Sequence, residues 1–462
     1  MPRTRSENPK EHVNLVRSKQ KNGWYYVLEV TSVYDPKIKN SRKIRSRLVG
    51  KLPPGETDLS KMIPTEPGRG RQKKSVPDTF SELKDNRNPA YVVYPLDLTL
   101  LVVVLAAMAG YTSCYQVAQY WASNRAVLKK YFDDFPDHDI SHDTVRRLIK
   151  LIGKEQSEQL IKRFTQSLQN PIKHRVISVD GQSVKASKTT TQPKGQYILN
   201  LFDADDGLCL EQRVIGEKEN EITQATDLID SLNIEGAVVT CDALNTQTKF
   251  AKKIVEKGAD YCMALKGNHE LLFDLVQSWF KTQQAQIAKS SQTLDSGHGR
   301  IETRKIAVLP GSLLSDPLYE KTAKPWVGLE DGCLIKLTSE AVIKATGEIR
   351  YDERYFISSL HFDQQYIAPL LLKTIRSHWA IENNLHWVLD VTFNQDRMHC
   401  RNADYLAGRT VMTKLAFNII SQLQAQEEEQ TGKRASTKPQ WIVKLNNTEL
   451  AIRELFNLLN AR

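Results

Sequence analysis

Apolar and polar residues alternate along residues 22–50 with the two-residue period of a β-strand. The alternation breaks at Asp35-Pro36, so the segment predicts a hairpin or a three-stranded unit that turns there. We expect a basic, β-rich N-terminal unit over residues 1–52. Residues 53–92 are rich in Pro, Gly, Glu, Lys and Ser and poor in large apolar side chains, and this composition predicts a linker.

The apolar spacing becomes helical over residues 93–170, which predicts a helical domain. Two helices are expected over residues 98–109 and 115–131, and a third follows Ser141, whose side chain can cap it. The apolar face of the third helix consists of Val145, Leu148, Ile149 and Ile152, and its other faces carry Arg146, Arg147 and Lys150. A basic helix after a helical pair could read DNA as a helix-turn-helix does, but an ordinary helical bundle explains the pattern equally well.

Residues 171–425 alternate between apolar β-branched runs and helical segments, which predicts an α/β fold. The order is three strands, a helix, a strand, a helix and a strand, the order of a ribonuclease H-like catalytic core. The first and fourth strands lead into Asp180 and Asp242, and in such a core these strands are neighbours. The acids are therefore expected to converge.

A third acid, Glu382, lies 140 positions after Asp242, far more than the core needs. We therefore expect a β-rich insertion at about residues 290–362, where three segments are strand-like. A long helical stretch over residues 364–390 then returns Glu382 to the core. Residues 426–462 are expected to form a C-terminal tail with a short helix.

The composition argues against several classes of protein. The six cysteines are scattered without a CxxC pair, which argues against a disulfide framework and against zinc knuckles. No apolar run approaches the roughly 20 residues that cross a bilayer, and the first residues lack the apolar segment of a secretory signal. We expect a cytoplasmic protein with no membrane partner.

The chain carries a formal net charge of +10. Its basic residues cluster at residues 37–51 and 69–74. Such clusters suit a polyanion such as DNA, because each neutralised phosphate releases counterions. Basic linkers and tails can also serve only to solvate a chain, and for residues 69–74 both readings stay open.

Asp180, Asp242 and Glu382 form the candidate chemical centre. A hard divalent cation prefers carboxylate oxygens, and two such ions can clamp the attacking and leaving oxygens of a phosphodiester. We expect Mg²⁺, with Mn²⁺ able to substitute. An Asp after a strand often only forms a turn or caps a helix. Glu382, however, lies in an apolar helical segment, where a carboxylate needs a partner or a metal.

The helical segment around Glu382 allows a second metal hypothesis. His378, Glu382 and His386 share one helical face at a spacing of four residues, which could ligate zinc. The two strand-end aspartates would then have no role. Trp379 and Trp387 could be packing aromatics, or one of them could stack on a flipped base.

Several blocks carry a resemblance to a known family. They are VDGQSVKAS (179–187), GEKENEI (216–222), VVTCDALNTQ (238–247), ADYCMALKGNH (259–269), GHGRIETR (297–304) and RSHWAIENNLHWVLDVTF (376–393). On these blocks residues 96–425 resemble DDE transposases of bacterial insertion sequences, in particular the ISAs-type, or H-repeat-associated, branch. The resemblance implies that Asp180, Asp242 and Glu382 are the catalytic metal ligands.

The chain departs from the family pattern near the site. Gln182 and Lys185 stand where the family usually has Lys and Arg. Related branches carry Tyr, Arg and Lys around the glutamate, where this chain has Ile375, His378 and Leu389. The basic unit before residue 60 has no counterpart in the common pattern.

The resemblance implies double-stranded DNA partners, both the terminal repeats of the element and the target DNA. The enzyme would cleave the element ends and transfer the 3′-OH strand to the target, with a homodimer holding the synaptic complex. The candidates for positioning DNA are Lys185, Lys266, Asn268, His298, Arg300, Arg376, His378 and Trp379. Two alternatives stay open: a nuclease that never joins strands, and an inactive DNA-binding relic acting as a regulator.

Overall fold

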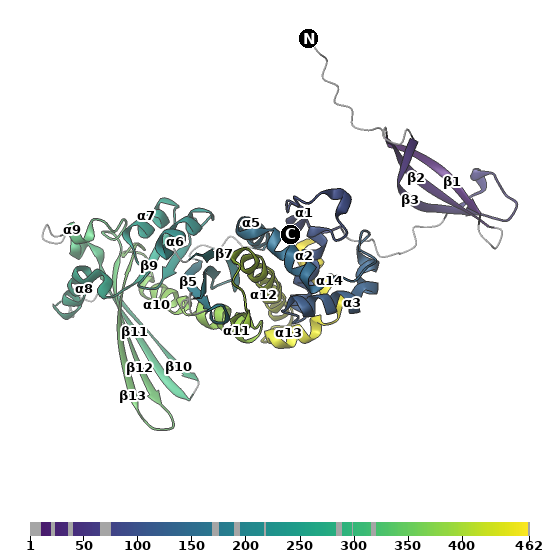
Figure 1. The fold of residues 1–462 in the computed structure, drawn as a ribbon. Helices are drawn as coiled ribbons and strands as arrows, with labels where there is room; N and C mark the ends of the chain where they lie inside the picture. Colours follow the sequence, from purple (N-terminus) through teal and green to yellow (C-terminus); the bar gives the residue numbers. More distant parts are fainter. Residues whose placement is uncertain are drawn as a thin grey trace, which may run out of the picture. The chain divides into compact units, whose positions relative to one another are not determined.

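The computed structural model describes residues 11–19, 24–35, 40–64, 75–168, 175–188, 195–216, 219–282, 289–297, 299–315 and 320–460 (Figure 1). The chain forms two compact units, Met1–Lys74 and Ser75–Arg462. No helix among these described ranges is long and apolar enough to cross a membrane.

The first unit is an antiparallel sheet in the order β1-β2-β3-β4. Its strands are β1 (Glu11–Lys19), β2 (Tyr25–Asp35), β3 (Asn40–Leu52) and β4 (Ile63–Pro64). Asp35 faces Asn40 across the β2–β3 hairpin, which confirms the predicted position of the turn. Strand β1 was not predicted. The basic cluster at residues 69–74 lies outside the described residues.

The second unit begins inside the segment that its composition assigns to a linker. Phe80, on helix α1 (Asp78–Ser81), is fully buried, and Leu83 is also buried. Both belong to the same core cluster as the helices that follow. Residues 75–92 are therefore anchored to this core at Phe80 and Leu83, while most of their other side chains are exposed.

Three helices follow as expected, α2 (Leu96–Met108), α3 (Cys114–Tyr131) and α4 (His142–Leu151). A fourth helix, α5 (Gly153–Gln166), was not predicted. Ser141 caps α4, and the predicted apolar face of α4 is buried. These helices form a helical layer. Its central helix is α12 (Ala403–Thr431), which comes much later in the sequence and packs against α2, α4 and α5.

The C-terminal segment differs from the prediction of a tail with one short helix. It forms two helices, α13 (Lys438–Leu445) and α14 (Thr448–Asn460), and α14 packs against α2, α3 and α12. Ala451, Ile452 and Leu455 are fully buried. Residues 438–460 are therefore packed as part of the helical layer and do not form a free tail.

The second unit also contains a nine-stranded mixed sheet, in the order β10-β11-β12-β13-β9-β8-β5-β6-β7 (Figure 1). Its first strands along the chain are β5 (Val176–Val184), β6 (Gln196–Asp203), β7 (Leu208–Ile215), β8 (Val238–Cys241) and β9 (Asp260–Leu265). β5 pairs with β8 in parallel, so the first and fourth strands are neighbours as predicted. Helices α6 (Glu221–Asp230) and α7 (Thr248–Glu256) connect the strands.

The insertion is β-rich, but it extends the core sheet. Its strands are β10 (Lys289–Gly297), β11 (Arg300–Pro310), β12 (Cys333–Ile343) and β13 (Ile349–Ser358). β13 pairs antiparallel with β9, with Ser358 opposite Cys262. The insertion joins the core sheet because the free edge of β9 accepts β13 as its next strand. Helix α8 (Glu270–Thr282) was not predicted.

The helical stretch that carries Glu382 is not a regular α-helix. Helix α10 (Ile367–His378) crosses the sheet in contact with β5, β8 and β9. It is followed by a π-helical turn, Ile381–His386, and by α11 (Trp387–Val391). π-Turns within helices are rare and frequent at functional sites.

Candidate active site

Two of the predicted acids meet at the centre of the sheet. In the β5–β8 register Val179 faces Cys241, so Asp180 and Asp242 are the next residues on adjacent strands. Asp242 directly follows the last residue of β8. Asp180 does not end its strand as expected, because β5 continues to Val184 in pairing with β6.

Glu382 joins the two aspartates from the π-turn. All three carboxylates line one cavity of about 540 Å³, together with Lys266, His378 and Trp379. Glu382 is exposed, whereas the apolar character of its segment suggested an enclosed side chain. Its neighbours Ile381 and Leu385 are buried instead, and the π-turn leaves the carboxylate free to face the cavity.

The site concentrates negative charge. Burial, together with the nearby carboxylates Asp242, Glu382 and Glu221, raises the pKa of Asp180 to about 7 against the lowering effect of the Gly181 N–H. A hard divalent cation binds carboxylate oxygens and would offset this negative charge. The residues therefore fit such an ion by their chemistry. As placed within the described ranges, no three His, Cys, Asp or Glu side chains are close enough to share one ion.

Sequence reasoning assigned no role to Glu221, a fourth carboxylate in the first turn of α6. The Nδ2 of Asn245 donates to Glu221 Oε1 at 2.9 Å and to Asp242 Oδ1 at 3.2 Å. The Asn245 backbone N–H also donates to Asp242 Oδ1, at 3.1 Å. Asn245 therefore holds the Asp242 carboxylate. The blocks GEKENEI and VVTCDALNTQ contain both residues and were the available signal.

Gly181 and Tyr197 form a close contact beside Asp180. A Cβ at position 181 would lie 1.9 Å from the Tyr197 hydroxyl oxygen, so a larger residue there would force the ring to move. The Tyr197 hydroxyl is hydrogen-bonded to Glu221. The Asp-Gly pair thus has a packing reason, which is to let this ring cross β5 toward the acids.

Both histidines of the zinc hypothesis have other partners. The Nδ1 of His378 lies 3.1 Å from Thr240 Oγ1, and the Nε2 of His386 lies 3.1 Å from Asn200 Nδ2. Burial lowers the pKa of His378 to about 4 and that of His386 to about 3. The rings are therefore neutral and engaged with polar side chains on β8 and β6.

Comparison with known proteins identifies the chain. Residues 171–419 match the family model described as "Transposase DDE domain", and residues 77–165 match the model described as "DDE_Tnp_1-associated". The chain belongs to the DDE transposase family. The matched range contains all three carboxylates of the cavity.

Curated relatives agree with the H-repeat-associated branch. YhhI of Escherichia coli K12, named as an H repeat-associated candidate transposase, is 26% identical over 75% of this chain and 90% of its own. YncI of E. coli O157:H7, also named as a candidate transposase, is 28% identical over 75% of this chain and 87% of its own. Among solved structures, a piggyBac transposase synaptic complex with hairpin DNA matches 82% of this chain and 77% of its own, at 11% identity and a TM-score of 0.39.

The transposase's two departures after Asp180 have structural partners. Gln182 is buried, and its Nε2 donates to Asp390 Oδ1 at 2.7 Å while its Oε1 accepts from Gln395 at 3.0 Å. It therefore ties β5 to α11 rather than facing solvent. Lys185 forms an ion pair with Asp396 at 2.5 Å, and its side chain is 70% exposed.

The other candidates for DNA contact lie in different places. Lys266 is exposed and lines the cavity of the acids. Asn268 donates to the backbone oxygen of Ala243 at 2.6 Å, which braces the loop after Asp242. His298 lies outside the described residues. Arg300, Arg376 and Trp379 line a second pocket.

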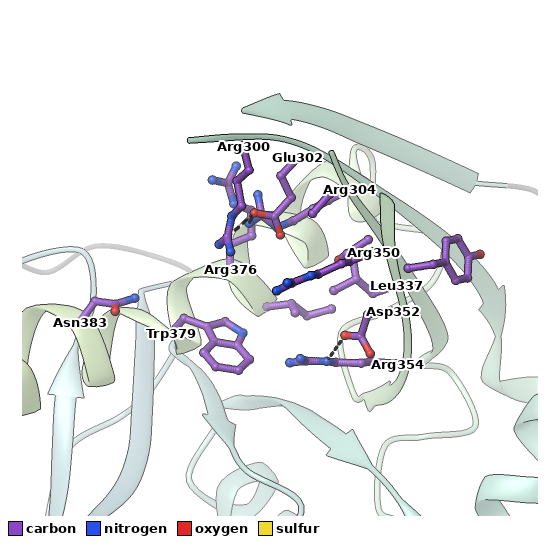
Figure 2. Close-up of a pocket in the computed structure, with 14 residues that line it drawn as sticks. Arg300, Glu302, Arg304, Leu337, Arg350, Asp352, Arg354, Arg376, Trp379 and Asn383 are labelled. Atoms are coloured by element: carbon purple, nitrogen blue, oxygen red, sulfur yellow. Dashed lines mark hydrogen bonds and ion pairs between the residues drawn. The ribbon is translucent and has the colours of Figure 1, made fainter. Parts of the chain in front are cut away.

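Figure 2 shows this second pocket, the arginine pocket. It adjoins the cavity of the acids. The two share Asp352, Arg354, Ile375 and Trp379. Its arginines come from β11, β13 and α10 and are Arg300, Arg304, Arg350, Arg354 and Arg376. The guanidinium of Arg354 lies 4.9 Å from the ring centre of Trp379, which is 41% exposed. The extended sheet thus builds a basic, aromatic-edged surface beside the acids.

Proposed function

We propose that this DDE transposase cleaves the ends of an insertion sequence and transfers the freed 3′-OH strand to target DNA, using a ribonuclease H-like core. The observation that carries the proposal is the convergence of Asp180, Asp242 and Glu382 on one cavity from three separate elements. The order β7-β6-β5-β8-β9, with the aspartates on β5 and after β8, supports the core assignment.

In this proposal Asp180, Asp242 and Glu382 hold Mg²⁺, and Mn²⁺ substitutes. When bound, such ions lower the pKa of an attacking water and stabilise the leaving oxygen of a phosphodiester. The chain itself orients the ligands. Asn245 holds one oxygen of Asp242, and the π-turn presents Glu382 to the cavity.

The arginine pocket supplies the path for DNA in this proposal. Several of its guanidinium groups are already paired with acids, as Arg304 is with Glu302 at 2.7 Å and Arg354 with Asp352 at 2.6 Å. An arginine in such a pair can exchange its carboxylate for a phosphate that offers the same bidentate geometry. Phosphate contacts there would lead a strand toward the acids, with Lys266 contacting it inside the cavity.

The test uses purified protein, Mg²⁺, a labelled duplex carrying the DNA ends that flank the gene, and a supercoiled target. Nicked and joined products are expected from the wild-type chain. Asp180→Asn, Asp242→Asn and Glu382→Gln should each reduce both products to background while DNA binding survives. Glu353→Gln is the matched control, since Glu353 lines the same cavity but is paired with Lys336 at 2.7 Å.

Two outcomes would replace the proposal. Nicking without joining would make the chain a nuclease without strand transfer. Binding without nicking in Mg²⁺ or Mn²⁺ would make it an inactive DNA-binding regulator. Because two ends must be held together, the synaptic complex should contain two protein copies, which sedimentation of the protein–DNA complex measures.

A further inference from the structure

Lys414 is a fully buried lysine on α12. Its Nζ donates to Asn200 Oδ1 and to Gln212 Oε1, both at 2.5 Å. Both acceptors are neutral amides rather than carboxylates. A buried ammonium is costly unless its donors are satisfied, so this residue calls for an explanation beyond packing.

The partners of Lys414 fix the direction of both amides. Gln212 Nε2 donates to Thr410 Oγ1 at 2.8 Å and to the backbone oxygen of Ala407 at 3.1 Å, so its Oε1 faces Lys414. An ammonium has donors and no acceptor. Asn200 must therefore also turn its oxygen to Lys414, which leaves its Nδ2 toward His386.

The orientation of the Asn200 amide determines which ring nitrogen of His386 carries a proton. The Nδ2 of Asn200 lies 3.1 Å from His386 Nε2, so Nε2 is an acceptor and carries no proton. An imidazole ring whose Nε2 carries no proton is neutral and holds its one proton on Nδ1. Nδ1 is the nitrogen that faces Asp180, 3.6 Å from Oδ2.

We propose that Lys414 and Asn200 are positioning residues that fix His386 as its Nδ1–H tautomer, so that an N–H dipole faces one oxygen of Asp180 and the other oxygen stays available to a cation. The inference rests on the proposed role of Asp180 as a cation ligand. The proposal gives a role to the series of polar contacts from Lys414 on α12, through Asn200 on β6 and His386, to Asp180. Groups that orient a ligand in this way typically change metal affinity by about 10–100-fold when altered.

Asn200→Asp is the discriminating substitution. The aspartate can still pair with Lys414, and it replaces the buried amide by a counter-ion, so the fold should persist. A carboxylate offers only acceptors to His386, however, so Nε2 must become a donor. The tautomer reverses or the ring becomes charged. Gln212→Glu is the matched control, because it gives Lys414 a carboxylate without touching His386.

The tautomer is measured first, by two-bond ¹⁵N–¹H NMR on protein labelled at histidine nitrogen, with His386→Gln used to assign the signal. The wild type should show the Nδ1–H pattern, Asn200→Asp should lose it, and Gln212→Glu should retain it. An Nε2–H pattern in the wild type would overturn the inference. This readout does not depend on any catalytic activity.

Cation affinity is measured second, by titrating Mn²⁺ and following free Mn²⁺ by electron paramagnetic resonance. Asn200→Asp should weaken binding by about tenfold or more, with Gln212→Glu unchanged. Thermal unfolding of each variant shows whether it is folded. Unchanged Mn²⁺ affinity in a folded Asn200→Asp protein would refute the positioning role. Wild-type affinity in Asp180→Asn would instead refute the proposed function and leave the tautomer result standing.

Discussion

The hydroxyl of Tyr197 lies where a side chain at Gly181 would begin, 1.9 Å from the position of a Cβ atom. The glycine lies between Asp180 and Gln182 on β5, so any displacement there moves both the acid and the strand's link to α11. A backbone position that looks like a simple Asp-Gly turn in the sequence is thus part of the packing of the active site.

Gly181→Ala should destabilise the protein by about 1–3 kcal/mol, the usual cost of forcing extra volume into packed structure. Tyr197→Ala removes the opposing ring, so the double variant should regain part of that loss. Chemical denaturation of the wild type, both single variants and the double variant gives the coupling energy. Additive losses would show that the ring and the glycine do not constrain each other.

Divalent cations should raise the melting temperature of the wild-type protein. Ligand binding to the native state adds about 1.4 kcal/mol at a concentration ten times the Kd. Asp242→Asn should remove this response, because it removes one of the donors that line the cavity. Differential scanning fluorimetry with Mg²⁺ and with Mn²⁺ measures it, and Glu353→Gln should respond as the wild type does. An equal response in Asp242→Asn would place the ion elsewhere.

Arg350→Gln should weaken DNA binding and flatten its salt dependence. Arg350 lines the arginine pocket and lies on the exposed part of β13. The slope of log K against log salt is negative, and loss of one phosphate contact reduces its magnitude by about 0.9. Lys252→Gln is the control, since Lys252 is exposed on α7 and absent from both pockets. Fluorescence anisotropy across a salt series should therefore separate the two variants, and equal slopes would argue against this DNA path.

Glu211 should make stability depend on pH. Burial raises its pKa to about 7 from the ordinary value of 4.5. Between these values the native state binds more protons than the unfolded state, so this contribution to stability is present below pH 4.5 and is lost as pH rises through 7. Glu211→Gln removes this dependence on pH. The free energy of unfolding of the variant, relative to that of the wild type, should therefore rise by up to about 3 kcal/mol between pH 4.5 and 7.

Urea denaturation of the two proteins at a series of pH values measures this difference. Glu211 accepts a hydrogen bond from Ser231 Oγ at 2.6 Å, which the glutamine oxygen can also accept. The difference between the wild type and Glu211→Gln therefore reports the ionisation of the Glu211 carboxyl. A difference in stability that stays constant with pH would show that the carboxylate is ionised in the native state throughout.

The sequence by itself determined the elements whose signals are local. The strands before Asp180 and Asp242, the capped helix after Ser141 and the hairpin around Asp35 all follow from periodicity and turn chemistry within a few residues. The convergence of the two aspartates also followed, because strand order along the chain implies which strands are neighbours. The family blocks pointed to the third acid, and Glu382 does line the same cavity.

Only the tertiary structure decided the relationships between distant residues. Lys414 meets Asn200 across 214 positions, and the arginine pocket combines arginines from two insertion strands and α10. The pairing of β13 with the β9 edge made the β-rich insertion part of the core sheet. The physical reason is that local patterns fix backbone conformation and the buried face, whereas a polar contact depends on which elements pack together, and packing is a property of the whole chain.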